Sequence, residues 1–416
     1  MSEEEEQLVI VPVAQTGGHF VNQGSYGCIF SPPLKCKSRL PVAATASKKG
    51  AKQHSDNIAK ISKSSHIVQE LYAAKFFENA ALAKKYFILA KLDTICKELK
   101  APNKQPEPDI MKCDIFNPLS GSAIDYTKLW QYEMEFGGPP LYKKIPKHLT
   151  YLPAKFDFFT FMRQMLEIGT FLALNGFVHN DLHKANIVMD NDFFPRVIDF
   201  NRSFSVQQIN GKLVEARFAN FQPDAGHVPP EISAIDGLNE KHSISEIMEA
   251  IRNKKPEIKM IEQFLGITKL AQMREFRQFW SSSPTVQSSS WTKFYRLYWP
   301  TMDAWGIGHV LMGILTRLHG LKTFYSTPEW NHKKFIVKSV MRGLLRTSPR
   351  ERIDCVEALS MYDPMNKVLL SDAGRVWLEK KHAVRQRQKV MRGGGAEDAE
   401  DTNTTFVEDD ELNALF

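Results

Sequence analysis

One short stretch constrains this 416-residue chain more than any other: a polar loop, 179–186, that leads directly into two short apolar runs. The runs are 186–190 (NIVMD) and 195–200 (PRVIDF), and the Asp-Asn-Asp between them is typical of a tight turn. The pattern predicts a hairpin. Asp181 and Asn186 in the loop could supply a general base and an amide oxygen for a metal. Asp199, at the end of the hairpin, could supply a second metal contact.

The same stretch, His179-Asn180-Asp181-Leu182-His183-Lys184-Ala185-Asn186 followed by Ile198-Asp199-Phe200, resembles the catalytic loop (H-R-D-L-x-x-x-N) and the D-F-G of protein kinases. The resemblance implies that Asp181 is the catalytic base. It implies that Asn186 is a magnesium ligand and Asp199 the principal one, and that His179 braces the loop.

Serine/threonine kinases usually carry a lysine two residues after the catalytic Asp, where it holds the γ-phosphate. In this chain that position is His183, and Lys184 comes next. Either could serve. We assign this catalytic role to Lys184 and keep His183 as the alternative.

The front part of the chain supports the same assignment. The segment Asn22–Ile29 resembles the glycine-rich loop G-x-G-x-x-G-x-V, with Asn22 at the first glycine. Glycines let a backbone close over phosphates without a Cβ in the way. The resemblance implies that the nucleotide is held by Asn22, Gly24, Ser25, Gly27 and Ile29.

A strand lysine and a hinge complete the expected nucleotide contacts. Ile58-Ala59-Lys60-Ile61 matches V-A-I-K, whose lysine holds the α- and β-phosphates. Its partner should be a glutamate on the next helix; Glu70 fits best, and Glu78 is the alternative. Alignment on the family's hinge assigns the adenine pocket to Met134, Glu135 and Phe136.

Three features of the rear part indicate a protein substrate. Pro229-Pro230-Glu231 resembles A-P-E, Asp303-Ala304-Trp305-Gly306 resembles the D-x-W-S/G that anchors the catalytic loop, and Arg352 sits where the family's buried arginine pairs with the A-P-E glutamate. Kinases of small molecules generally lack this trio. The resemblance implies ATP and Mg²⁺ as cofactors, with Mn²⁺ as an alternative ion. The competing hypotheses are a pseudokinase scaffold and an atypical kinase of a small molecule.

The chain departs from the family at the arginine of H-R-D, which is Asn180 here, and at the glycine of D-F-G, which is Asn201. The missing arginine normally meets a phosphate on the activation segment. Between Asp199 and Glu231 the only hydroxyl side chains are Ser203 and Ser205. We therefore expect activity without activation-segment phosphorylation.

The expected fold is α+β and two-lobed, with a small β-rich N-lobe and a larger, mainly helical C-lobe. We divide the chain into a flexible segment 1–18, an N-lobe 19–136 with an insertion at about 98–125, and a C-lobe 137–370 with an insertion at about 235–298. A basic helical segment, 371–392, and an acidic disordered tail, 393–416, follow. We expect strands before residue 62, a helix over 66–79, a long loop over 98–120, a strand over 129–136, and helices over 156–176 and 302–318.

Composition bears on the compartment, on membrane insertion and on binding to polyanions. Five scattered cysteines without a CxxC pair favour free thiols in a reducing compartment and argue against structural zinc. No apolar run is long enough to span a membrane. The net charge is +7, and the basic stretch 375–392 is either a solvated helix or an arm for nucleic acid or another polyanion.

The combination of GSYGCIF, a nearby Pro-Pro-Leu-Lys-Cys, HNDLH and IDFNRS is most similar to serine/threonine kinases of large nucleocytoplasmic DNA viruses. That likeness implies host cytoplasm or a virion as the location, with the nucleus left open, and protein substrates as partners.

Overall fold

The computed structural model describes residues 18–24, 27–39, 57–100, 108–116, 128–147, 149 and 151–393. The chain is mixed α+β, with a small antiparallel sheet and a larger helical part, as the sequence predicted. It divides into two compact units, Met1–Gly137 and Gly138–Phe416. The predicted flexible segment, except Gly18, and the predicted acidic tail, except Gly393, lie outside the described residues.

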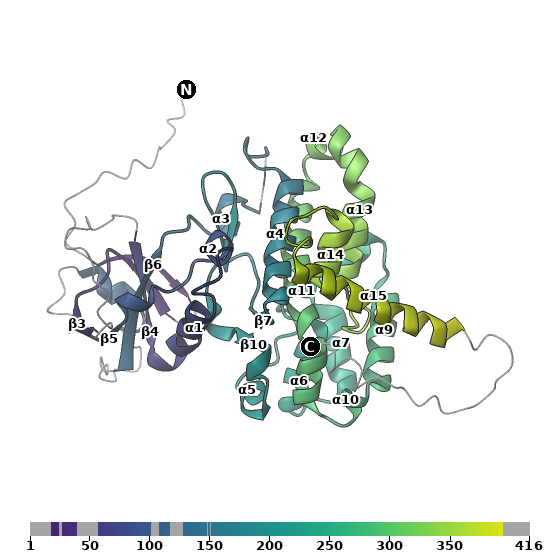
Figure 1. The fold of residues 1–416 in the computed structure, drawn as a ribbon, viewed down its shortest axis with the longest axis horizontal. Helices are drawn as coiled ribbons and strands as arrows, with labels where there is room; N and C mark the ends of the chain where they lie inside the picture. The colour runs from purple at the N-terminus through teal and green to yellow at the C-terminus, as the bar shows by residue number, and fades with distance from the viewer. Residues whose placement is uncertain are drawn as a thin grey trace. The chain divides into compact units, whose positions relative to one another are not determined.

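The first unit is built on a six-stranded antiparallel sheet with the order β1-β2-β4-β6-β5-β3 (Figure 1). The strands are β1 His19–Gly24, β2 Gly27–Ser31, β3 Cys36–Arg39, β4 Asn57–Lys63, β5 Cys96–Leu99 and β6 Leu129–Glu135. Helix α1, Ser64–Phe76, follows β4 without a loop, and α2 is Ala83–Tyr86. The strand predicted over 129–136 and the helix predicted over 66–79 are therefore confirmed within a few residues.

The stretch predicted as a long loop over 98–120 is more ordered than expected in its described parts. It contains the end of β5 and a 3₁₀ helix, Pro108–Lys112. Ile110, Cys113 and Phe116 are buried in one apolar cluster with Phe30 of β2 and Leu129 of β6. The described part of this stretch therefore covers sheet residues that would otherwise be exposed apolar surface.

Two disulfides tie this region together, so the expectation of free thiols is wrong for four of the five cysteines. Cys28 of β2 bonds Cys113, and Cys36 of β3 bonds Cys96 of β5, whereas Cys355 is a buried free thiol. The partners are 85 and 60 residues apart in sequence. The pairing of β3 with β5 brings Cys36 and Cys96 together, whereas Cys113 reaches β2 from the segment after the 3₁₀ helix. The cysteines therefore do not indicate a reducing compartment.

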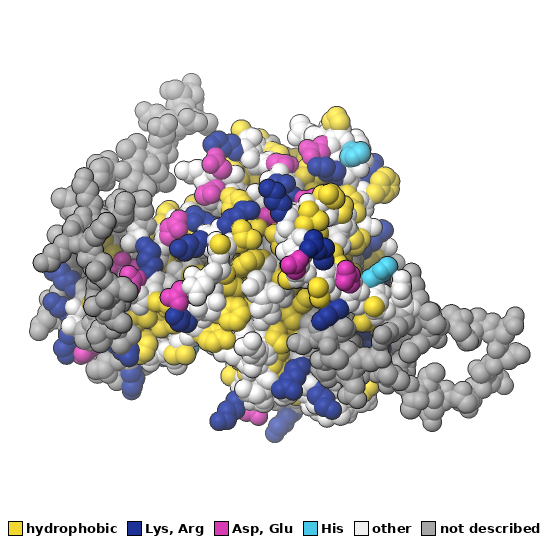
Figure 2. Space-filling model, in the orientation of Figure 1, with side chains coloured by type: hydrophobic (Ala, Val, Ile, Leu, Met, Phe, Trp, Pro, Cys, Tyr) yellow, Lys and Arg dark blue, Asp and Glu magenta, His cyan; other side chains and the backbone are white. Residues whose placement is uncertain are grey.

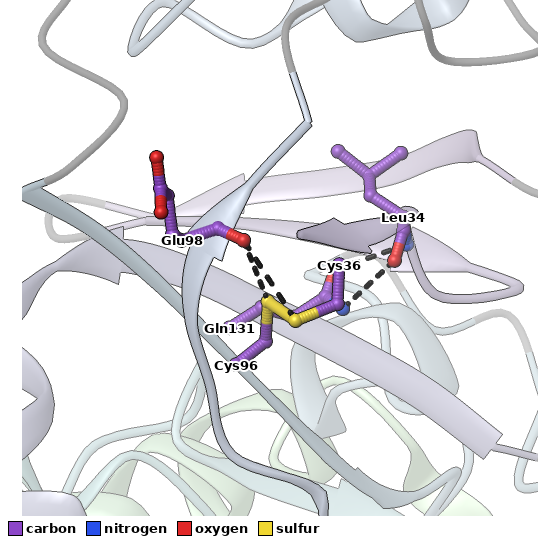
Figure 3. The surroundings of a disulfide bond; sticks show 5 residues. All are labelled: Leu34, Cys36, Cys96, Glu98 and Gln131. Atoms are coloured by element: carbon purple, nitrogen blue, oxygen red, sulfur yellow. Dashed lines mark hydrogen bonds between the residues drawn. A yellow bond between two sulfur atoms is a disulfide. The ribbon is translucent and has the colours of Figure 1, made fainter. Parts of the chain in front are cut away.

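The second disulfide lies beside a polar side chain that crosses between strands (Figure 3). Gln131 of β6 accepts from the Leu34 backbone N–H at 3.0 Å and donates to the Leu34 carbonyl at 3.1 Å. The two sulfurs lie 3.7 and 3.2 Å from the carbonyl oxygen of Glu98. A buried side-chain amide thus satisfies the backbone at Leu34, two residues before β3, and the disulfide joins the first residue of β3 to β5 close by.

These disulfides make a direct prediction about thiol counts. Protein purified without reductant, then denatured and alkylated, should take up label at Cys355 alone, whereas prior reduction should expose all five cysteines. Intact mass measures the difference. Reduction should also lower the melting temperature, because each bond restricts a long loop in the unfolded chain. Five labelled cysteines without reduction would contradict the prediction.

The second unit is mainly helical (Figure 1). Its short strands form two pairs, β7 Phe177–Val178 with β10 Phe204–Ser205, and β8 Ile187–Met189 with β9 Pro195–Val197. Its helices are α3 Leu141–Lys144, α4 Phe158–Leu174, α5 Gly211–Glu215, α6 Pro230–Asn239, α7 Ile244–Lys254, α8 Pro256–Met260, α9 Lys269–Ser282, α10 Pro284–Gln287, α11 Trp291–Leu318, α12 Lys322–Tyr325, α13 Pro328–Leu344, α14 Cys355–Tyr362 and α15 Asp372–Gly393.

Helices α4 and α11 show how capping residues and apolar sequence determine helix ends and burial. Asp157 caps α4 by accepting from the N–H groups of Phe159 and Thr160, and Gly176, just past the helix end, has a φ of +60°. Helix α11 starts well before the predicted residue 302 and contains Pro300 in its interior. The helix is nearly all buried from Phe294 to Leu318, as expected of a helix that is apolar nearly all round.

The basic segment predicted over 371–392 is helix α15. Its first half is fixed to the second unit, because Trp377 Nε1 donates to Asp354 and Lys381 lies 3.0 Å from the same carboxylate. On the face shown in Figure 2, Lys and Arg side chains are spread over the described surface and mixed with Asp and Glu. Among the described residues, no helix is long and apolar enough to cross a membrane.

Candidate functional site

In the first unit, a buried ion pair forms at the predicted lysine. Lys60 on β4 and Glu70 on α1 are each 6% exposed, and Lys60 Nζ lies 2.5 Å from Glu70 Oε1. The hydroxyl of Tyr132, which faces Lys60 across the β4–β6 pair, donates to the other Glu70 oxygen. The alternative, Glu78, pairs with Lys75 at the exposed end of the helix. The predicted Lys60–Glu70 pairing is therefore confirmed.

The glycine-rich segment forms the hairpin of β1 and β2. Asn22 faces Ile29 and Gly24 faces Gly27, while Ser25 lies outside the described residues. A Cβ on Gly27 would come within 2.3 Å of the Ile61 carbonyl oxygen, so this glycine is required by the close approach of β4. The contact of the Gly27 backbone with a phosphate remains a prediction.

The three hinge residues lie at and just beyond the end of β6. Met134 is buried opposite Ile58 on β4, whereas Glu135 and Phe136 are exposed. Met134 lies two residues after Tyr132, the residue that pairs with Lys60. That Met134 lines an adenine pocket remains a prediction.

In the second unit, the loop that begins at His179 is anchored by a carboxylate on α11. Asp303 accepts from the backbone N–H groups of His179 and Asn180, at 2.7 and 2.8 Å. The fully buried His179 ring contacts the Ile198 carbonyl oxygen through Nε2 at 3.0 Å and lies edge-on to Phe200. His179 thus joins the loop to the strand that leads to Asp199.

Asp181 and Asn186 are in direct contact at the two ends of the loop. Asn186 Nδ2 donates to the Asp181 carbonyl and to its Oδ2, at 3.0 and 3.2 Å. The amide oxygen of Asn186 therefore points away from Asp181. The Asn186 carbonyl accepts from the N–H of Ile198, which brings the residue before Asp199 alongside Asn186. Asp181, Asn186 and Asp199, predicted as the base and the metal ligands, therefore lie on neighbouring stretches of backbone.

Within the segment Asp199-Phe200-Asn201, the left-handed backbone is at Asp199 and not at Asn201, the residue that stands for the glycine of D-F-G. Asp199 has a φ of +66°, and a 3₁₀ turn, Phe200–Arg202, follows it. Asp and Asn are among the few side chains that adopt this conformation readily. Asparagine is therefore the least disruptive replacement at residue 199.

Two histidines surround the Asp181 carboxylate. His227 Nε2 lies 3.1 Å from Asp181 Oδ1, and His183 Nε2 lies 3.7 Å from the same oxygen. Burial raises the pKa of Asp181, but the hydrogen bond from His227 and the nearby His183 outweigh it, so the pKa is lowered. Asp181 is therefore ionised at neutral pH. Lys184, assigned the phosphate-holding role, has an exposed side chain, whereas its alternative His183 faces the carboxylate.

Asp181, His183 and His227 could also be considered as a metal-binding trio, since their ligand atoms lie within 4.8 Å of one another. Burial lowers the pKa of His183 to about 4, so its ring is neutral at pH 7. Its Nδ1 accepts from the N–H of Ala185, which leaves the proton on Nε2, directed at Asp181. A metal at that nitrogen would displace this proton and disrupt the Ala185 bond, so the arrangement favours a protonated His183 Nε2 facing Asp181 over a metal ligand at that nitrogen.

The predicted pairing of Glu231 with Arg352 is confirmed. Both side chains are fully buried, and the guanidinium donates through two nitrogens to the two carboxylate oxygens, at 2.7 and 2.8 Å. Arg352 also donates to the carbonyls of Arg346 and Thr301. This bidentate pair fixes the start of α6 against α11 and the segment before α14.

Sequence reasoning missed Tyr132, His227 and a group around Lys255. Tyr132 could have been found once β4 and β6 were paired in register, because it faces Lys60. His227 carries no motif; its only signal is its position three residues before Pro230. No family model matches the chain, and no curated protein matches it either.

Proposed function

We propose that this protein transfers the γ-phosphate of ATP to serine or threonine hydroxyls of protein substrates, with Mg²⁺. The observation that carries the proposal is the contact of Asp181 with Asn186, beside Ile198, the residue that precedes Asp199. The buried Lys60–Glu70 pair of the first unit supports it independently. Two-lobed kinase architecture is part of the same proposal.

In this mechanism, Asp181 accepts the proton of the substrate hydroxyl while the hydroxyl oxygen bonds to the γ-phosphorus and the bond to the leaving ADP oxygen breaks. Asn186 Oδ1 and the Asp199 carboxylate would hold magnesium, which neutralises charge on the phosphates. Lys60 would hold the α- and β-phosphates. Asp181 suits its role because its lowered pKa keeps it unprotonated at neutral pH.

The burial of the activation-segment serines supports activity without phosphorylation there. Ser203 and Ser205 are 0% and 1% exposed, and Ser203 Oγ donates to the Phe200 carbonyl. A modifying kinase could not reach either hydroxyl without unfolding the segment. The region 199–231 has no other Ser or Thr.

The test is transfer of labelled phosphate from ATP to a generic basic protein, with enzyme made in bacteria and treated with phosphatase. Wild type should transfer phosphate, and Asp199→Asn should lose about a hundredfold or more, because a neutral amide replaces the charged metal ligand while the left-handed backbone is kept. Asp192→Asn, an exposed aspartate on the same hairpin, is the matched control. ATP binding without transfer would favour the scaffold, and transfer to small hydroxyl compounds alone would favour the small-molecule kinase.

A further inference from the structure

The residues around His227 form a turn that is held from inside the second unit. The N–H of Val228 donates to the carbonyl of Ala225, which closes a four-residue turn with His227 as its third residue. Lys255 Nζ donates to the carbonyls of Ala225 and Val228, both at 2.9 Å. Trp305 Nε1 donates to the carbonyl of Gly226, also at 2.9 Å. Three of the turn's four carbonyls are thus bonded by two buried side chains.

Lys255 is an unusual residue to find in this place. It joins α7 to α8 within the 235–298 insertion, and it is only 2% exposed. Burial lowers its pKa to about 8, although Glu257 and Glu231 oppose the shift. A buried ammonium group is costly unless it is compensated. Here the compensation is the two carbonyls of the turn, so the position of the lysine and the shape of the turn depend on each other.

The Glu257 carboxylate lies directly against Gly226 of the same turn. It is fully buried, and its Oε1 lies 2.6 Å from Nδ1 of His309 on α11. A Cβ on Gly226 would come within 2.3 Å of that oxygen, so a larger residue at 226 would displace the carboxylate from its present position. The insertion therefore supplies both Lys255, which donates to the turn, and Glu257, whose carboxylate lies against Gly226 of the turn.

The turn presents His227 to the candidate base. The imidazole Nε2 lies 3.1 Å from Asp181 Oδ1, while Asn186 Nδ2 occupies Oδ2. Each carboxylate oxygen thus has one donor that fixes its direction and keeps a lone pair for a substrate hydroxyl. His183, on the loop itself, is farther away at 3.7 Å.

We propose that His227 is a positioning residue for Asp181, and that Lys255 and Glu257 hold it there permanently. The insertion would thereby do what a phosphate on the activation segment does in switched kinases, which is to order that segment through a charge-assisted contact. The inference rests on the proposed function for the role of Asp181. The support of the turn by Lys255 can be tested separately.

The first test compares two replacements of a partly exposed side chain, so that folding is not at risk. His227→Gln keeps an N–H donor near the same place and should retain kcat within about threefold, whereas His227→Leu should lose about tenfold or more, as expected for a hydrogen bond to a charged group. KM for MgATP should stay the same in both. Equal kcat values for the two variants would overturn the positioning role.

The second test measures backbone hydrogen exchange over 224–229 in the full chain. Lys255→Met should speed exchange at Val228 by about tenfold or more, because the turn loses two charge-assisted bonds. Lys254→Met, the exposed neighbour, is the matched control. Unchanged exchange in Lys255→Met overturns the support of the turn. Absence of phosphate transfer by wild type would instead contradict the proposed function, and exchange would still decide the role of Lys255.

Discussion

Replacing Asp181 by asparagine should lower kcat about a thousandfold while leaving the dissociation constant for MgATP within about threefold. Asparagine keeps the size of the side chain and can still accept from His227 through its amide oxygen. It cannot accept a proton at neutral pH. The loss should therefore fall on the chemical step and spare nucleotide binding.

Single-turnover transfer and equilibrium binding of a fluorescent ATP analogue separate the two effects. Asp192→Asn changes the same chemical group on the same hairpin at an exposed position, and should behave as wild type. Asp181→Asn that retains more than a tenth of wild-type kcat would show that another group removes the proton. His183, 3.7 Å from Asp181, would be the first residue to test then.

Removing one partner of the Glu231–Arg352 pair should cost about 3–5 kcal/mol of folding free energy. Arg352→Met leaves the Glu231 carboxylate buried without its guanidinium, and it also takes hydrogen bonds from the carbonyls of Thr301 and Arg346. The penalty comes mainly from the stranded charge. The double variant Glu231→Met with Arg352→Met should therefore recover part of the loss.

Urea unfolding measures these free energies. Lys155→Met, which breaks an exposed pair with Asp192, is the comparison and should cost less than about 1 kcal/mol. A loss from Arg352→Met no larger than that from Lys155→Met would mean that the buried pair contributes little. A double variant worse than either single variant would mean that packing, not charge, decides the cost.

Elements with a clear local signal were predictable from the sequence. The hairpin around Asp190 has a turn that its own carboxylate closes, since Asp190 accepts from the N–H groups of Asp192 and Phe194. Helix α4 has its cap residues next to its apolar repeat. The choice of Glu70 over Glu78 also followed from local pattern, because Glu70 lies among the buried residues of α1.

Contacts between distant segments were not predictable in the same way. The disulfide between Cys36 and Cys96 depends on the pairing of β3 with β5, and no strand was predicted at β5. Lys255 reads in the sequence as an ordinary surface lysine at a helix end. Only the fold shows that it is buried under the turn that carries His227.

Helix α11 carries three side chains that contact three separate segments of the second unit (Figure 1). Asp303 holds the loop of Asp181, Trp305 holds the turn of His227, and His309 meets Glu257. An extra residue within this stretch would turn everything after it by about 100° and shift it by about 1.5 Å. One inserted or deleted residue would therefore misplace the side chains after it, whereas a substitution changes only one of them. We expect this stretch to tolerate substitutions better than insertions or deletions.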